Sequence, residues 1–269
     1  MNEINMKNKF FMSKIMLKLR FWLLLFFIPL ISRGQTSVLD REYFPDFYIG
    51  IIAGYSMHTY KGTISTYEKS NECGTFTDGD GKGLIFGLKM EYNLTRKLNL
   101  LFSLLYEDRG GNFNSSIVTA PVFIDDNTLV KNASLEEKLE SKINTFSLNP
   151  MIKFKPLDVD LGIIFGPSIS FITSDEITHN ESILSPNELF FLKTRSKTRT
   201  VLTDKINSKS SMLLDLKTGL SYGIPINGYF KITPEIFYFY PLIKVSSNSD
   251  WKISGLQVFL SFSYAIIKN

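Results

Sequence analysis

The sequence predicts an all-β fold, an eight-stranded antiparallel up-and-down transmembrane β-barrel over residues 46–269. Three observations support this prediction. Apolar and polar residues alternate along eight long segments, every second connection is short, and the polar faces are rich in Gly and Ser. Alternation with a period of two indicates strands, because successive side chains of a strand point to opposite faces.

Residues 1–34 have the order of a secretory signal peptide. Basic residues precede the apolar run Phe21–Ile31, and small residues stand at positions −3 and −1 of a cut before Gln35. As a helix, this run would reach roughly 16 Å, about half of the hydrocarbon thickness, which favours a cleaved signal over a retained anchor. We therefore expect a cleaved signal peptide over 1–34 and a periplasmic lead-in over 35–45.

Eight segments of the remaining chain have one apolar and one polar face. They are expected to form strands at residues 47–59, 84–93, 98–107, 145–154, 159–171, 212–223, 229–242 and 255–266. A strand of about eleven residues, tilted by about 45°, spans roughly 26 Å, which matches the apolar band of outer-membrane barrels. Globular strands average about five or six residues, so the length favours a membrane barrel.

The connections between these segments differ in length. Short turns are expected at residues 95–97, 156–158 and 225–228, and long loops at 61–81, 110–140 and 174–210, with a shorter loop at 246–250. Outer-membrane barrels have tight periplasmic turns and longer outside loops. We expect the same orientation here, with both ends of the barrel in the periplasm.

Three prolines fall inside the predicted strands, at positions 150, 167 and 234. Proline has no backbone N–H and removes one hydrogen bond from the ladder. We therefore expect bulges or local ladder breaks at these positions.

The polar faces distinguish a membrane barrel from a soluble barrel of lipocalin type, which would place its apolar face inside. Water-facing strands usually carry long charged side chains, whereas a narrow interior must be filled by small residues and paired charges. The charges on the polar faces nearly balance. They are Lys89, Glu91, Glu107, Lys153, Asp160, Asp215, Lys217, Lys231 and Glu235. We expect them to form an ion-paired filling rather than to line an open pore.

Four short motifs also stand out: TFSLNPMIKF at 145–154, GPSISF at 166–171, PLI at 241–243 and WKISGLQVFLSF at 251–262. They resemble the PorT-like outer-membrane β-barrel family of Bacteroidetes. The resemblance implies an eight-stranded outer-membrane barrel and, for some members, a role in protein secretion or surface assembly. It implies no catalytic residues, and the long third outer loop departs from the compact members.

Few residues suggest chemistry. A barrel hydrolase or acyltransferase would use a rim histidine with a serine and an acid, so His58 and His179 are the candidates. No motif surrounds either histidine, and the simpler interpretation is that both are rim residues. The sequence DGDG at 78–81 lacks the spaced ligands of a calcium loop, and the lone Cys73 forms no intrachain disulfide. We expect no catalytic, metal or cofactor site.

The predicted loop 174–210 is basic, and Lys193, Arg195, Lys197 and Arg199 are its candidate contact residues. They would suit anionic lipopolysaccharide or an acidic protein partner, in contacts that weaken with salt. The sequence thus predicts a monomeric, non-enzymatic outer-membrane protein that contacts membrane lipid and uses its outside loops for partner binding or assembly, with no nucleic-acid partner. The rival hypotheses are a barrel enzyme and a small pore or ligand carrier. The partner and the initiating methionine are not determined by the sequence.

Overall fold

The computed structural model describes residues 45–65, 75–114, 116–124, 128–157 and 159–266. These residues belong to one compact unit that begins at Pro45. The predicted signal peptide 1–34 and all but the last residue of the predicted lead-in lie outside the described residues. Within the described ranges, no helix is long and apolar enough to cross a membrane.

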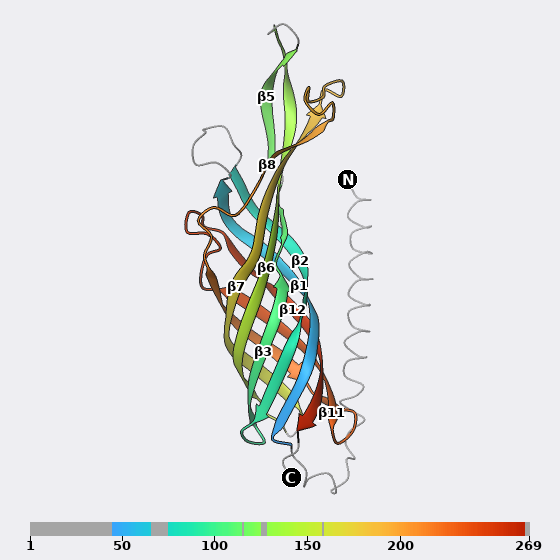
Figure 1. Cartoon of the computed structure of the whole chain (residues 1–269), viewed down its shortest axis with the longest axis vertical. Coiled ribbons are helices and arrows are strands. Elements are labelled where there is room, and N and C mark those ends of the chain that lie inside the picture. The colour runs from blue at the N-terminus through green and yellow to red at the C-terminus, as the bar shows by residue number, and fades with distance from the viewer. Residues whose placement is uncertain (1–44, 66–74, 115, 125–127, 158, 267–269) are drawn as a thin grey trace, which may run out of the picture. The chain divides into compact units, whose positions relative to one another are not determined.

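Twelve antiparallel strands form the described part of the chain. They are β1 (Phe47–Ser65), β2 (Thr75–Asn93), β3 (Leu98–Asp108), β4 (Gly111–Phe113), β5 (Ser116–Ile124), β6 (Thr128–Phe154), β7 (Leu161–Ser185), β8 (Thr198–Asp204), β9 (Met212–Tyr222), β10 (Ile224–Pro225), β11 (Phe230–Pro241) and β12 (Lys252–Ile266). Eight of them close a ring in the order β1–β2–β3–β6–β7–β9–β11–β12 (Figure 1). Each of the eight predicted segments matches one strand of this ring to within two residues or lies inside it, so the predicted fold is confirmed.

The outer wall of the ring is apolar, and its inner face is polar. Along β1 the odd-numbered residues face outward and the even-numbered residues face inward, so Ile51 is 64% exposed while Ser56 is fully buried. The other ring strands alternate in the same way, and Leu84 of β2 is 67% exposed. A soluble barrel would bury these apolar side chains, so the geometry is that of a barrel whose wall faces lipid.

Two ends of the barrel are distinguished here by their connections. The turn end carries the short connections 94–97, 155–160 and 226–229, together with the first residue of β1 and the last of β12. The opposite end, here called the extension end, carries the longer connections. An even number of ring strands places both ends of the barrel chain on the same side.

Two of the three prolines interrupt a ladder as expected. Pro150 of β6 and Pro167 of β7 face each other in a gap of the β6–β7 ladder between the pairs Leu148–Ile169 and Ile152–Phe165. Both strands keep their register across this gap, so it is a ladder break rather than a bulge. Beside it, the outer wall is hollowed by an apolar groove of about 540 Å³. Pro234 lies where the β9–β11 ladder has ended.

The connections predicted as long loops at residues 110–140 and 174–210 are largely strand. Strands β6 and β7 run on well beyond the apolar wall, and β5 and β8 pair along their outer edges. The result is a four-stranded sheet, β5–β6–β7–β8, here called the extension, which projects from one end of the barrel (Figure 1). The pattern missed it because strands that leave the membrane no longer need an apolar outward face.

A single β-bulge separates the two parts of β7. Ile172 pairs with Thr145 and Ser174 with Asn144, so Thr173 is an extra residue without a partner in that ladder. Before the bulge the even-numbered residues of β7 are buried, and beyond it the odd-numbered residues 177, 179, 181 and 183 are buried. The bulge therefore exchanges the two faces of β7 where the barrel gives way to the extension.

Candidate functional site

The interior nearest the turn end holds four paired charges. The Lys231 ammonium donates to Glu91 Oε2 at 2.9 Å, and Lys153 donates to Asp160 Oδ1 at 2.8 Å. Lys153 also lies 3.4 Å from Glu91, and Asn99 donates an amide hydrogen bond to the same carboxylate at 2.6 Å. Three of these side chains come from strands and Asp160 from the connection 155–160, and opposite charges lie next to each other, as the cost of burying charge requires. Lys155, which is also buried, lies 3.9 Å from Asp160 and adds a further positive charge to this group.

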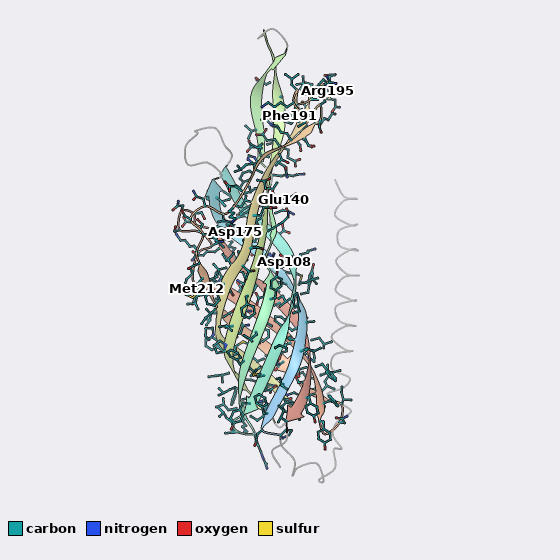
Figure 2. All side chains as sticks on the ribbon, viewed as in Figure 1. Asp108, Glu140, Asp175, Phe191, Arg195 and Met212 are labelled. Carbon is teal, nitrogen blue, oxygen red and sulfur yellow. The ribbon has the colours of Figure 1, made fainter. Side chains whose placement is uncertain are left out.

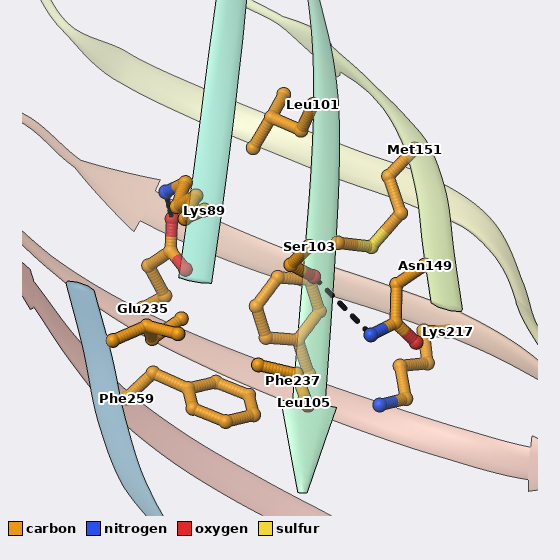
Figure 3. A pocket seen from close by; sticks show the side chains of 11 residues that line it. Lys89, Leu101, Ser103, Leu105, Asn149, Met151, Lys217, Glu235, Phe237 and Phe259 are labelled. Atoms are coloured by element: carbon orange, nitrogen blue, oxygen red, sulfur yellow. Dashed lines mark hydrogen bonds and ion pairs between the residues drawn. The ribbon is translucent and has the colours of Figure 1, made fainter. Parts of the chain in front are cut away.

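The middle of the barrel combines one ion pair with an apolar layer. Lys89 of β2 pairs with Glu235 of β11, and both are buried (Figure 3). The apolar layer around this pair is formed by Ile52, Ile85, Leu101, Leu105, Met151, Ile164, Phe237 and Phe259. The cavity between them measures about 10 Å³, roughly the space for one water molecule. The centre of the barrel is therefore filled.

A second charged layer lies between this centre and the extension end. Arg109 donates to Glu107 Oε2 at 2.8 and 2.9 Å and to Asp215 Oδ2 at 2.8 Å. Lys217 donates to the other oxygen of Glu107 at 2.9 Å, and Gln257 donates to Glu107 Oε2 at 3.3 Å. The four charged groups sum to zero, and all are at least 98% buried.

The nine charged residues predicted to fill the interior all lie inside the barrel and take part in these three groups. The sequence interpretation missed two further buried cations, Arg109 and Lys155. The signal was available, because Arg109 continues the odd-numbered inward face of β3 one step beyond Glu107. The predicted strand ended at Glu107, where the outward face turns polar at Asp108.

An aromatic cluster closes the extension end of the barrel. The rings of Tyr60, Phe113 and Trp251 contact one another, with centroid separations of 5.0 to 5.2 Å. The Tyr60 hydroxyl donates to the carbonyl oxygen of Arg109 at 2.7 Å, which ties this cluster to the charged layer beneath it. The surrounding side chains are apolar and buried. A continuous aqueous path along the barrel is therefore not present among the described residues.

The two histidines lie in separate groups. His58 is 2% exposed; its Nδ1 lies 3.3 Å from Ser56 Oγ and its Nε2 lies 2.9 Å from the Gly110 carbonyl oxygen. This serine–histidine contact is itself buried, while Gly81 and Gly110 beside it line a polar cavity of about 380 Å³. His179 lies in the extension, where burial lowers the pKa of its imidazole despite the nearby carboxylates of Glu137 and Glu181.

The basic residues predicted to contact a partner lie in and beside the hairpin between β7 and β8, in the part of the extension far from the barrel (Figure 1). Figure 2 shows Phe191 and Arg195 there, far along the long axis from Asp108. Lys193, Arg195 and Lys197 are exposed. Arg199 is also exposed, but it pairs with Glu181 at 2.7 Å and lies over the ring of Phe191 at 4.4 Å. The first three residues, together with the neighbouring Leu192, which is 79% exposed, are here called the basic tip.

Fold and interior together define a class: a closed eight-stranded β-barrel of the membrane type with a filled core and an external sheet. No protein-family model and no curated protein sequence matches the chain. The resemblance to the PorT-like family therefore stays an expectation.

Solved structures that resemble the chain include three outer-membrane proteins. Ail, the attachment invasion locus protein of Yersinia pestis, is 12% identical, with 81% of this chain and 98% of that chain covered and a TM-score of 0.33. Neisserial surface protein A is 13% identical (82% and 97% covered, TM-score 0.35). The outer membrane protease OmpT of Escherichia coli is 11% identical (86% and 98% covered, TM-score 0.32). At these TM-scores the likenesses carry no inference about activity.

Proposed function

We propose that the chain is an integral outer-membrane protein that binds a partner outside the cell through its extension, and that it is neither a pore nor an enzyme. The observation that carries this proposal is the contrast between a barrel filled by ion-paired charged layers and an aromatic cluster, and an external sheet that carries an exposed basic tip. The turn end then faces the periplasm. Membership of the PorT-like family, and a role in secretion or surface assembly, fit this arrangement.

The height of the extension favours a partner other than membrane lipid. From Ser174 to Ser185, β7 advances eleven residues, which is roughly 36 Å along the strand and about 26 Å along the barrel axis at a tilt of 45°. The headgroup layer on one side of a bilayer is only about 5–8 Å thick. The basic tip thus stands beyond the lipid phosphates, and we favour an acidic protein partner over lipopolysaccharide phosphate.

The orientation can be tested with single cysteines in a Cys73→Ser background. Arg195→Cys places a thiol at the basic tip, and Leu157→Cys places a matched thiol at the turn end, where Leu157 is 57% exposed. We expect a membrane-impermeant maleimide to label Arg195→Cys on intact cells and to label Leu157→Cys only after lysis. Labelling in the reverse order would contradict the proposed orientation.

Partner binding can be tested by photo-crosslinking in the native host. A photoreactive residue at Leu192 should give an adduct of discrete mass, and the same residue at Leu157 should not. Neutralising the tip by Lys193→Gln and Arg195→Gln should remove the adduct, because steering by exposed charge is lost. An adduct that persists after neutralisation, or a ladder typical of lipopolysaccharide, would count against an acidic protein partner.

The enzyme rival is tested by His58→Ala and His179→Ala. If the purified barrel hydrolyses lipid or peptide substrates and either substitution abolishes that activity, the non-enzymatic proposal fails.

A further inference from the structure

Three potential metal ligands meet in the extension, away from the filled barrel. Glu137 of β6 and Glu181 of β7 are direct cross-strand partners, and His179 lies two residues before Glu181 on the same face. One ligand atom from each of the three side chains lies within 4.8 Å of the other two. All three are buried, with exposures of 6%, 8% and 0% for Glu137, Glu181 and His179.

His179 is the unusual member of this group. Among the described residues, neither of its ring nitrogens has a hydrogen-bond partner, although the side chain is fully buried. Its ring packs edge-on against Phe76 at a centroid distance of 5.2 Å, which fixes its position without satisfying either nitrogen. A buried polar group without a partner costs about 1–3 kcal/mol, so a bound ligand is the natural explanation.

The two carboxylates point to a positively charged ligand. Like charges directly opposite each other on neighbouring strands destabilise a sheet. Arg199 of β8 donates to Oε2 of Glu181 at 2.8 Å, which orients this carboxylate and leaves lone pairs for a further cation. Metal-binding carboxylates are commonly held in this way by a neighbouring donor.

We propose that His179, Glu137 and Glu181 bind one divalent transition-metal ion, of which Zn²⁺ fits best, with water completing a four-coordinate site. Imidazole with two carboxylates suits Zn²⁺, whereas Ca²⁺ and Mg²⁺ prefer oxygen ligands alone. Bond lengths of about 2.0–2.2 Å require the three ligand atoms to approach one another slightly, which side-chain rotation allows. The ion would clamp β6 to β7 at a place where the β-bulge has turned His179 and Glu181 inward.

The sequence predicted no metal site for two reasons. Glu137 and His179 are separated by 42 positions in the chain, so no ligand spacing is visible. In addition, continued alternation along β7 without the bulge would place His179 on the outward face. The site is independent of the proposed partner, so either proposal can fail without the other.

The test is a Zn²⁺ titration of the tag-free mature chain, folded in detergent micelles, stripped of metal and carrying Cys73→Ser. Isothermal calorimetry should show one Zn²⁺ per chain and no comparable binding of Ca²⁺. His179→Ala and Glu137→Gln should each weaken binding by more than the roughly 10- to 100-fold that loss of an outer partner costs. His58→Ala, the matched control, should bind as the parent does. No binding by the parent, or equal binding by His179→Ala, would overturn the proposal.

A second variant separates ligation from packing. His179→Cys keeps a metal ligand but loses the ring against Phe76, so it should retain Zn²⁺ binding. Loaded with Co²⁺, it should gain a thiolate-to-metal absorption band. Retention of heat-modifiable gel mobility checks that each variant is a folded barrel. A folded His179→Cys chain without the absorption band would refute metal ligation by this position.

Discussion

The charge balance of the interior can be tested at Arg109. Arg109→Met removes the positive charge and keeps an apolar stem of similar length, so Asp215 loses the ion pair that the structure shows for it. Glu107 keeps Lys217 at 2.9 Å, but the layer as a whole becomes negative by one charge. Breaking a buried ion pair by removing one partner costs about 3–5 kcal/mol, and we expect a loss of this size in the free energy of unfolding.

The double variant Arg109→Met/Asp215→Leu makes the reasoning specific. It removes both partners, leaves the Glu107–Lys217 pair intact and restores neutrality. Replacement of a whole buried ion pair by apolar side chains is often neutral or stabilising, so the double variant should recover about 2 kcal/mol or more relative to the single variant. As a control, Lys142→Met breaks an exposed ion pair with Glu176 and should cost about 0–1 kcal/mol.

Urea unfolding in lipid vesicles provides the measurement. In a mature chain that begins at Gln35, the fully buried Trp251 is the single tryptophan, so its fluorescence reports the loss of the aromatic cluster. The reasoning is refuted if the double variant is no more stable than Arg109→Met. It is equally refuted if Arg109→Met costs no more than the surface control.

Three further outcomes follow from the geometry. Gly162→Ala should destabilise the barrel by about 1–3 kcal/mol, because a Cβ there would lie 2.5 Å from Cε of Lys153. A Cβ at Gly228 would have no atom within 4 Å, so Gly228→Ala should be neutral in the same urea titration. Planar-bilayer recordings of the purified chain should show no unitary conductance, and steady channel steps would contradict a filled interior. Deleting Thr173 should remove the face exchange of β7, expose His179 and increase hydrogen exchange in residues 174–185; unchanged protection would refute the role assigned to the bulge.

The barrel could be predicted because lipid imposes a strict rule on every strand that crosses it. Each outward position must be apolar and each inward position must fit a narrow interior, so the pattern of Leu256 to Ile266 permits one interpretation. The inward charges were predictable for the same reason, since Lys89 and Glu235 have no acceptable place on the outer wall. Their individual pairings were not, because the pairing depends on which strands become neighbours across the barrel.

The alternation of apolar and polar residues does not reveal the extension, the β-bulge or the neighbours of His179. Outside the membrane a strand has water on one side or both, so the outward residues of β6 and β7 follow no apolar rule and resemble loop sequence. A bulge adds one residue without changing the composition of the strand, so the sequence does not identify Thr173 as the bulged residue. His179 was therefore recognised as a candidate without its partners, and Glu137 was not recognised at all.

The facing prolines of β6 and β7 have a mechanical consequence. Around Pro150 and Pro167 the two strands share no ladder bonds, although lipid offers the freed backbone carbonyls no water to compensate. The contact between β6 and β7 at this place therefore depends on side-chain packing and on the lipid acyl chains that fill the outer groove. Unfolding of the barrel should therefore begin with the separation of β6 from β7. The composition of the bilayer should set the rate of this step.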